Sequence, residues 1–296
     1  MRRPRLIAVL PTLLTLGNAA CGFGAITLAA KLGPGLVEGP QQLLFYAGLL
    51  IFLGMLCDML DGSAARLTGQ TSEIGAQLDS LCDAVTFGVA PAFIMLQFVE
   101  HALDGYEVPF LYPKRLVWTI ACLYSLCAIM RLARFNVETD DDDSHEEFSG
   151  LPSPAAAGTV AAFPIAMPEL FKIAADSGSW APWINGTVIP LVRLSVPLVT
   201  LAVAALMVSR IRYPHFLTQL LRGRKPRRTL IQLLFGAAIL FLFHELALPI
   251  AFCWFALASP VKALWFEVFP VRSHSAADPS AADLPGHVPE ESEQAV

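Results

Sequence analysis

Charged residues are scarce in this sequence. They make up 15% of its 296 residues, against about a quarter in a typical soluble domain. Hydrophobic residues account for 55%, and the mean hydropathy is +0.57. The apolar residues occur in long blocks, each near the roughly 20 residues that a helix needs to cross a bilayer. The composition therefore excludes a string of soluble domains and predicts an all-α integral membrane protein, a polytopic helical bundle.

Cysteine is also infrequent, and no two cysteines form a CxxC pair. All six lie in apolar segments, which favours small packing residues over a disulfide framework or a zinc site. His244-Glu245 is not followed by a second histidine at the spacing of a zinc protease, so that class is excluded as well. The cysteines are Cys21, Cys57, Cys82, Cys122, Cys127 and Cys253.

The apolar blocks predict about eight transmembrane helices. They cover approximately 12–31, 42–67, 73–99, 115–137, 153–171, 187–209, 229–245 and 247–266. The last two blocks are alternatively one segment with a break at Pro249. The first block resembles a secretory signal ending at Cys21. Because Asn18 interrupts it and hydrophobicity continues to Ala30, we interpret it as a retained span.

The charges are segregated along the chain. Basic residues gather at Arg2, Arg3 and Arg5 and between 210 and 228, which by the positive-inside rule predicts that both termini are cytoplasmic, in the cell (inner) membrane. Basic clusters beside membrane spans more often set topology than bind nucleic acid, so no nucleic-acid partner is expected.

Two acidic segments lie outside the apolar blocks. The segment 138–147, with its run of aspartates, is interpreted as a solvated loop rather than a metal site. Residues 273–296 are rich in Ala, Pro, Ser, Asp and Glu and are predicted to be a disordered cytoplasmic tail. Residues 1–272 then form one membrane domain.

Four aspartates stand at the ends of two adjoining apolar blocks. Asp58 and Asp61 are three residues apart, and Asp79 and Asp83 are four apart, so each pair shares one face of its helix. The short connection between the helices predicts that all four carboxylates converge. Without cations they would repel one another, but with hard divalent cations they form a shell of oxygen ligands suited to magnesium or manganese.

The neighbouring residues fit a phosphate site. Gly62 and Gly75 suggest that something bulky approaches the backbone, since glycine destabilises a helix by roughly 1 kcal/mol relative to alanine. Ala65 keeps the region narrow, and Arg66 supplies a permanent planar cation that matches a phosphate. Ser72 precedes the next helix, where a hydroxyl and free N–H groups receive an anion or cap the helix.

The pattern Asp58-x-x-Asp61-Gly62-x-x-Ala65-Arg66, then eight residues, then Gly75-x-x-x-Asp79-x-x-x-Asp83, resembles the signature of the CDP-alcohol phosphatidyltransferase family. All eight fixed positions match. The resemblance implies that Asp58, Asp61, Asp79 and Asp83 bind divalent metal, as two ions, and that Asp83 is also the general base. It further implies CDP-lipid contacts from Gly62, Ala65, Arg66, Ser72 and Gly75, and a homodimer.

Three other stretches resemble the bacterial phosphatidylserine synthases of that family. They are 11–23 (PTLLTLGNAACGF), 131–136 (RLARFN) and 150–158 (GLPSPAAAG). The resemblance implies CDP-diacylglycerol and L-serine as substrates. Arg131 and Arg134 share a helix face and are expected to bind the carboxylate of serine, with an amide contact from Asn136. The arginines are alternatively membrane anchors.

Other interpretations remain open at the level of sequence. The close relative archaetidylserine synthase uses a different lipid, and phosphatidylglycerophosphate and phosphatidylinositol-phosphate synthases use other acceptors. A cation-coupled transporter would also place carboxylates in a membrane, but near the bilayer midplane rather than at span ends. It would not explain the spacing of the glycines and Arg66.

Overall fold

The computed structural model describes seven stretches of the chain: residues 5–32, 39–68, 73–102, 112–138, 147–176, 178–214 and 244–268. The predicted tail 273–296 and most of the predicted span 229–245 lie outside the described residues.

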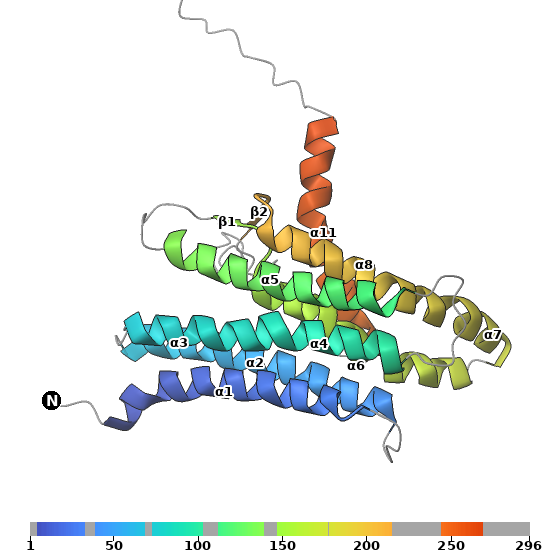
Figure 1. The fold of residues 1–296 in the computed structure, drawn as a ribbon, viewed down its shortest axis with the longest axis horizontal. Coiled ribbons are helices and arrows are strands. Elements are labelled where there is room, and N and C mark those ends of the chain that lie inside the picture. Colours follow the sequence, from blue (N-terminus) through green and yellow to red (C-terminus); the bar gives the residue numbers. More distant parts are fainter. Residues whose placement is uncertain are drawn as a thin grey trace, which may run out of the picture.

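The described chain is nearly all helical, as the composition predicts (Figure 1). Its helices are α1 (Arg5–Ala30), α2 (Pro40–Thr68), α3 (Glu73–Asp83), α4 (Ala90–Gln97), α5 (Lys114–Glu138), α6 (Ser153–Asp176), α7 (Ala181–Trp183), α8 (Ile189–Val208) and α11 (His244–Val268). Wider π-helical turns, η1 (Ala84–Val89), η2 (Phe98–Ala102) and η4 (Ile184–Val188), adjoin α4 and α8, and a 3-10 turn, η3 (Gly178–Trp180), precedes α7.

In the part of the chain that the structure describes, six helical segments are long and apolar enough to cross a membrane, which makes the chain an integral membrane protein. They are Leu10–Ala30, Gln41–Ala64, Ile74–His101, Lys114–Val137, Ser153–Asp176 and Ala181–Val208, close to the first six predicted spans. The predicted count of eight is not confirmed. Helix α11 begins at His244 and ends at Val268, close to the predicted span 247–266, and it continues through Pro249.

One short strand pair departs from the all-helical expectation. Strand β1 (Glu147–Ser149) pairs antiparallel with β2 (Arg212–Pro214), with Phe148 opposite Tyr213. The end of the acidic segment 138–147 is therefore part of a strand. The chain then turns at Gly150, whose φ of +86° suits glycine, and a Cβ there would lie 2.5 Å from the carbonyl oxygen of Met207.

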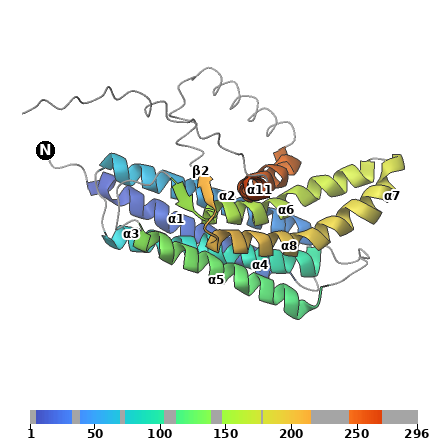
Figure 2. The same ribbon diagram turned by 90° about the horizontal axis from the view of Figure 1, so that it is seen from above.

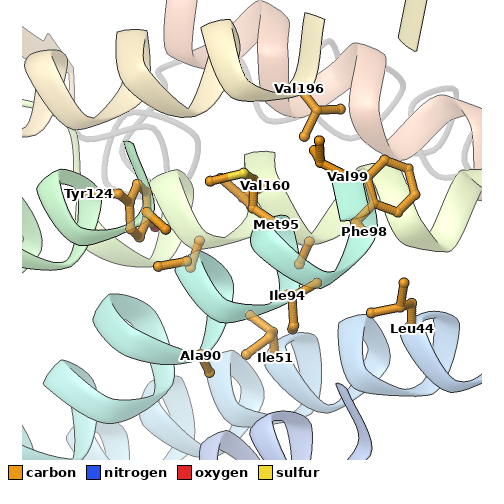
Figure 3. Close-up of a cluster of buried hydrophobic side chains, with 14 of the residues drawn as sticks. Leu44, Ile51, Ala90, Ile94, Met95, Phe98, Val99, Tyr124, Val160 and Val196 are labelled. Atoms are coloured by element: carbon orange, nitrogen blue, oxygen red, sulfur yellow. The ribbon is translucent and has the colours of Figure 1, made fainter. Parts of the chain in front are cut away.

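The third span, α3–η1–α4–η2, is the central element of the bundle. In an apolar window of 18 residues within this span 67% of the residues are buried, whereas in the first span 28% are. Helix α1 packs along α2, α5 along α8, and α11 against α6 (Figures 1 and 2). Figure 3 shows the core around α4, where Ile94 and Met95 lie near Ile51 and Val160. Within this span Asp83, directly before η1, is buried in the bundle, whereas Asp79 on α3 is half-buried.

Helices α1 and α2 meet the third span at two glycines. A Cβ added to Gly22 would lie 2.5 Å from Oγ1 and 2.8 Å from Cα of Thr86, and one added to Gly54 would lie 2.7 Å from Cγ2 of Thr86. Only glycine lets the three backbones approach so closely. This junction lies one to two helical turns from the aspartates.

We expect Gly22→Ala to destabilise the protein, because the backbone of Thr86 cannot move away as a flexible side chain does. Overpacking of this kind typically destabilises a fold by about 1–3 kcal/mol. The measurement is the thermal unfolding midpoint of the detergent-solubilised protein. Gly186→Ala is the matched control, because a Cβ there meets nothing within 4 Å. Equal midpoints for both variants would contradict the close approach.

Candidate active site

Three aspartates converge where α2 ends and α3 begins. Asp58 and Asp61 lie on α2, and Asp79 lies on α3. One carboxylate oxygen of each lies within 4.8 Å of the other two. Helix α1 packs against both α2 and α3 and so holds the two carboxylate-bearing faces together. The helical spacing predicted this convergence for these three side chains.

Asp83 lies next to this group but is held separately. It stands at the end of α3, directly before η1, and is buried at 9% exposure. Its Oδ1 accepts a hydrogen bond of 2.8 Å from Nδ2 of Asn18 on α1. Asp83 is close enough to interact electrostatically with all three other aspartates. The structure thus places one predicted ligand beside the three-carboxylate group rather than within it.

Two carboxylate oxygens in the group have no hydrogen-bond partner. They are Oδ2 of Asp61 and Oδ1 of Asp79, and both are buried. Buried polar atoms are normally satisfied, and buried negative charge is normally compensated. Hard oxygen ligands without protein donors are what a divalent cation requires. The residues present therefore fit a divalent metal site.

Open space adjoins the carboxylates at Gly62. A Cβ added there would meet nothing within 4 Å, unlike the tightly packed Gly22 and Gly54. Ala65 and Arg66 follow Gly62 on the last turns of α2, and Gly75 lies in the first turn of α3. Ser72 lies outside the described residues. The backbone around Gly62 is thus accessible to a ligand that approaches the carboxylates.

Arg131 on α5 lies near Asp83. Its side chain is half-buried and interacts electrostatically with Asp83. Its Nη1 donates a 2.8 Å hydrogen bond to Oγ of Ser153, at the start of α6, and its Cζ lies 5.7 Å from the ring centre of Phe135. These contacts hold the guanidinium inside the bundle. A membrane anchor would instead extend toward the headgroups, so the geometry favours a role at the site.

Asn136 is engaged by α3. Its Nδ2 lies 2.9 Å and its Oδ1 lies 3.1 Å from the hydroxyl oxygen of Ser80, close enough for either group to donate. This contact ties α5 to the helix that carries Asp79 and Asp83. Arg134 lies one turn from Arg131 and is partly buried. The structure therefore places Arg131 near Asp83. The amide of Asn136, which was expected to contact serine, is hydrogen-bonded to Ser80.

The wide turns of η1 are held by hydroxyls from α5. The hydroxyl of Tyr124 donates to the carbonyl oxygen of Phe87 at 3.1 Å, and that of Ser125 to the carbonyl oxygen of Gly88 at 3.2 Å. π-Helical turns are frequent at functional sites. Here the turn begins directly after Asp83 and sets where α3 ends.

A sequence model of CDP-alcohol phosphatidyltransferases matches residues 8–192. The chain belongs to this family. The matched region holds all four aspartates as well as Asn18 and Arg131. Members of the CDP-alcohol phosphatidyltransferase family generally depend on a divalent metal, which agrees with the oxygen-rich group at Asp58, Asp61 and Asp79.

Individual relatives within the CDP-alcohol phosphatidyltransferase family are about one-third identical to this chain. A CDP-diacylglycerol–serine O-phosphatidyltransferase of Mycobacterium tuberculosis is 32% identical over 197 residues, 64% of this chain and 61% of the relative. A protein of the same name from Bacillus subtilis is 30% identical over 213 residues, which cover 70% of this chain and 90% of the relative. An archaetidylserine synthase of Methanothermobacter thermautotrophicus is 34% identical over 208 residues, 70% of each. The chain spans about three fifths of the length of the mycobacterial relative.

Asn18 and Ser153 were not predicted as site residues from the sequence. Both are fully buried polar residues that contact site side chains. A signal for Asn18 was available, because an amide that interrupts an apolar span is costly and usually has a partner. Ser153 carries no comparable signal, since a serine at the start of a helix is ordinarily a cap.

Proposed function

We propose that this protein transfers a phosphatidyl group from CDP-diacylglycerol to L-serine, giving phosphatidylserine and CMP. The observation that carries the proposal is the group of Asp58, Asp61 and Asp79 within 4.8 Å of one another, in a chain of this family. Similarity to proteins named CDP-diacylglycerol–serine O-phosphatidyltransferase supports serine as the acceptor.

The metal ligands are proposed to be Asp58, Asp61, Asp79 and Asp83, holding two Mg²⁺ or Mn²⁺ ions. When bound, such ions neutralise the charge of the diphosphate and of the leaving group. The unpartnered oxygens of Asp61 and Asp79 support this assignment. The residues proposed to contact the CDP-lipid are Arg66, Ser72, Gly62, Ala65 and Gly75. The open space at Gly62 supports this proposal.

The reaction is a direct displacement at phosphorus. Asp83 takes the proton from the serine hydroxyl as the serine oxygen forms its bond to the phosphorus attached to diacylglycerol. The bond from that phosphorus to the CMP oxygen breaks, and CMP leaves. Arg131, held beside Asp83, binds the carboxylate of serine, and Arg134 adds a second cation on the same helix. Asn136 contributes by fixing α5 to α3.

The setting in the cell is proposed from charge distribution and family. Both termini and the site face the cytoplasm of the inner membrane, because the basic residues flank that side. Residues 1–272 are proposed to form the membrane domain and to act as a homodimer. A site at the ends of the spans suits a reaction between a lipid and a water-soluble acceptor.

One further candidate has a specific observation in its favour. The similarity to an archaetidylserine synthase leaves a different lipid donor open, with the same acceptor. Acceptors that carry an extra phosphate, such as glycerol phosphate or inositol phosphate, would need an additional cationic site. Arg131 and Arg134 are the cations at hand on α5.

We expect purified protein with Mn²⁺ or Mg²⁺ to release CMP from CDP-diacylglycerol when serine is added. Inositol phosphate, glycerol phosphate and choline should give little release, because choline lacks the carboxylate that Arg131 binds and the two phosphates would need a further cationic site. Release with another alcohol would overturn the assignment of serine as the acceptor. Release only with CDP-archaeol would overturn the assignment of CDP-diacylglycerol as the lipid donor. No release with any pair, from folded protein, would favour a transporter.

A further inference from the structure

Asn18 forms a polar contact between α1 and the central span. It is fully buried within the apolar span Leu10–Ala30. Its Nδ2 donates to Oδ1 of Asp83 at 2.8 Å, and its backbone carbonyl accepts from the hydroxyl of Thr86 at 2.9 Å. Asn18 is thus joined twice to one turn of the chain, once through its side chain and once through its backbone.

The glycines of the junction make this contact possible. A Cβ on Gly54 would lie 3.0 Å from Oδ1 of Asn18, and a Cβ on Gly22 would collide with Thr86. The side-chain oxygen of Asn18 itself has no hydrogen-bond partner. Of the two polar atoms of the amide, only the donor Nδ2 is therefore hydrogen-bonded, and its acceptor is Asp83.

Packing alone does not account for an amide at this position. Leucine has the same branching and the same number of side-chain heavy atoms, and it would avoid the desolvation of an amide inside an apolar span. A hydrogen bond to an ionised acceptor is roughly twice as strong as a neutral one. The other charged groups that face Asp83 are Asp58, Asp61, Asp79 and Arg131.

A carboxylate with no hydrogen-bond donor rotates easily about its terminal torsion. The terminal torsion of an aspartate side chain is broad rather than confined to narrow wells, so packing around its Cβ does not fix the two oxygens. A donor on one oxygen does fix them. A base must lie within hydrogen-bond reach of the proton that it takes, and small misplacements of reacting groups reduce rates strongly.

We propose that Asn18 is a positioning residue for the transfer reaction: it holds Oδ1 of Asp83 and so leaves Oδ2 as the oxygen that receives the proton of the acceptor hydroxyl. This inference rests on the proposed function. It adds a residue from α1 to a site otherwise built from α2, α3 and α5. Asn18 touches neither substrate and acts through Asp83 alone.

We expect Asn18→Leu to lower kcat for serine-dependent CMP release by about 10–100-fold, the usual effect of removing a group that orients a site residue. The KM values for CDP-diacylglycerol and serine should change by less than about threefold, because no substrate contact is lost. If Asn18→Leu does not fold, Asn18→Ser is measured in the same way, since its hydroxyl is too short to reach Asp83.

Thr86→Val is the matched control. It removes the other hydrogen bond of the same junction while keeping the shape of the side chain. Its thermal midpoint should fall only slightly, because a neutral hydrogen bond is worth little by itself. Its kcat should stay within about threefold of the parent, because the hydroxyl of Thr86 bonds the backbone of Asn18 and not Asp83. Equal losses of kcat in both variants would show that the junction's packing matters, not the donor, and would overturn the proposal.

A second measurement does not depend on turnover. With metal removed by EDTA, Asn18→Asp should lower the thermal midpoint, because two carboxylates would then face each other at the distance of the hydrogen bond. Adding Asp83→Asn to that variant restores a donor–acceptor pair with exchanged partners and should recover the midpoint. No recovery would contradict a direct pairing of the two side chains.

The outcomes separate the two proposals. If the parent protein does not release CMP with serine, the proposed function fails, while the midpoints of the exchanged pair still test the contact between Asn18 and Asp83. If the parent is active and folded Asn18→Leu keeps its kcat, only the role of Asn18 is overturned.

Discussion

Asp83→Asn is expected to abolish nearly all serine-dependent CMP release. The variant cannot accept a proton, and general-base catalysis contributes about 10²–10⁴-fold to a rate. It also removes one negative charge from the proposed metal site. We therefore expect kcat to fall by at least about 10³-fold. The measurement is the rate of CMP release at saturating serine and metal.

The fold should survive Asp83→Asn. An asparagine oxygen at this position still accepts the hydrogen bond from Nδ2 of Asn18, and the side chain keeps its volume. Asp176→Asn is the matched control, because it makes the same chemical change at an exposed position at the end of α6 and should keep full activity. If Asp83→Asn kept more than about one-tenth of the parent rate, Asp83 would not be the base.

Removal of divalent metal is expected to have an equally large effect. Chelation with EDTA should abolish activity, and Mn²⁺ or Mg²⁺ should restore it. Asp61→Asn and Asp79→Asn each remove a charged ligand and should raise the Mn²⁺ concentration needed for half-maximal activity at least about tenfold, since ligand charge sets affinity at such sites.

Metal binding can also be measured without turnover. A cation that binds only the folded protein stabilises it by about 2.7 kcal/mol at 100 times its Kd. The thermal midpoint of the parent should therefore rise as Mn²⁺ is added, and Asp61→Asn should need more Mn²⁺ for the same rise. A midpoint that does not respond to Mn²⁺ would contradict a metal site at these carboxylates. Glu169→Gln, on α6 beside Lys172, serves as the control.

The sequence by itself determined the class of the fold and the core of the site. Long apolar blocks predicted six of the spans to within six residues at each end, because the thickness of a bilayer sets the length of a helix. Helical spacing determined that Asp58 and Asp61 share one face, and the short connection placed Asp79 near them. These features depend on neighbours along a single helix or across one turn.

Only the tertiary structure decided which side chains from other helices complete the site. Asn18 lies 65 residues from Asp83, and Asn136 lies 56 residues from Ser80. Periodicity shows which face a residue occupies but not which residue lies opposite it. That depends on how closely two helices approach and at what register, and here Gly22 and Gly54 set the approach around Thr86. Asp83 therefore faces Asn18 beside the carboxylate group, a placement that its i,i+4 spacing from Asp79 could not reveal.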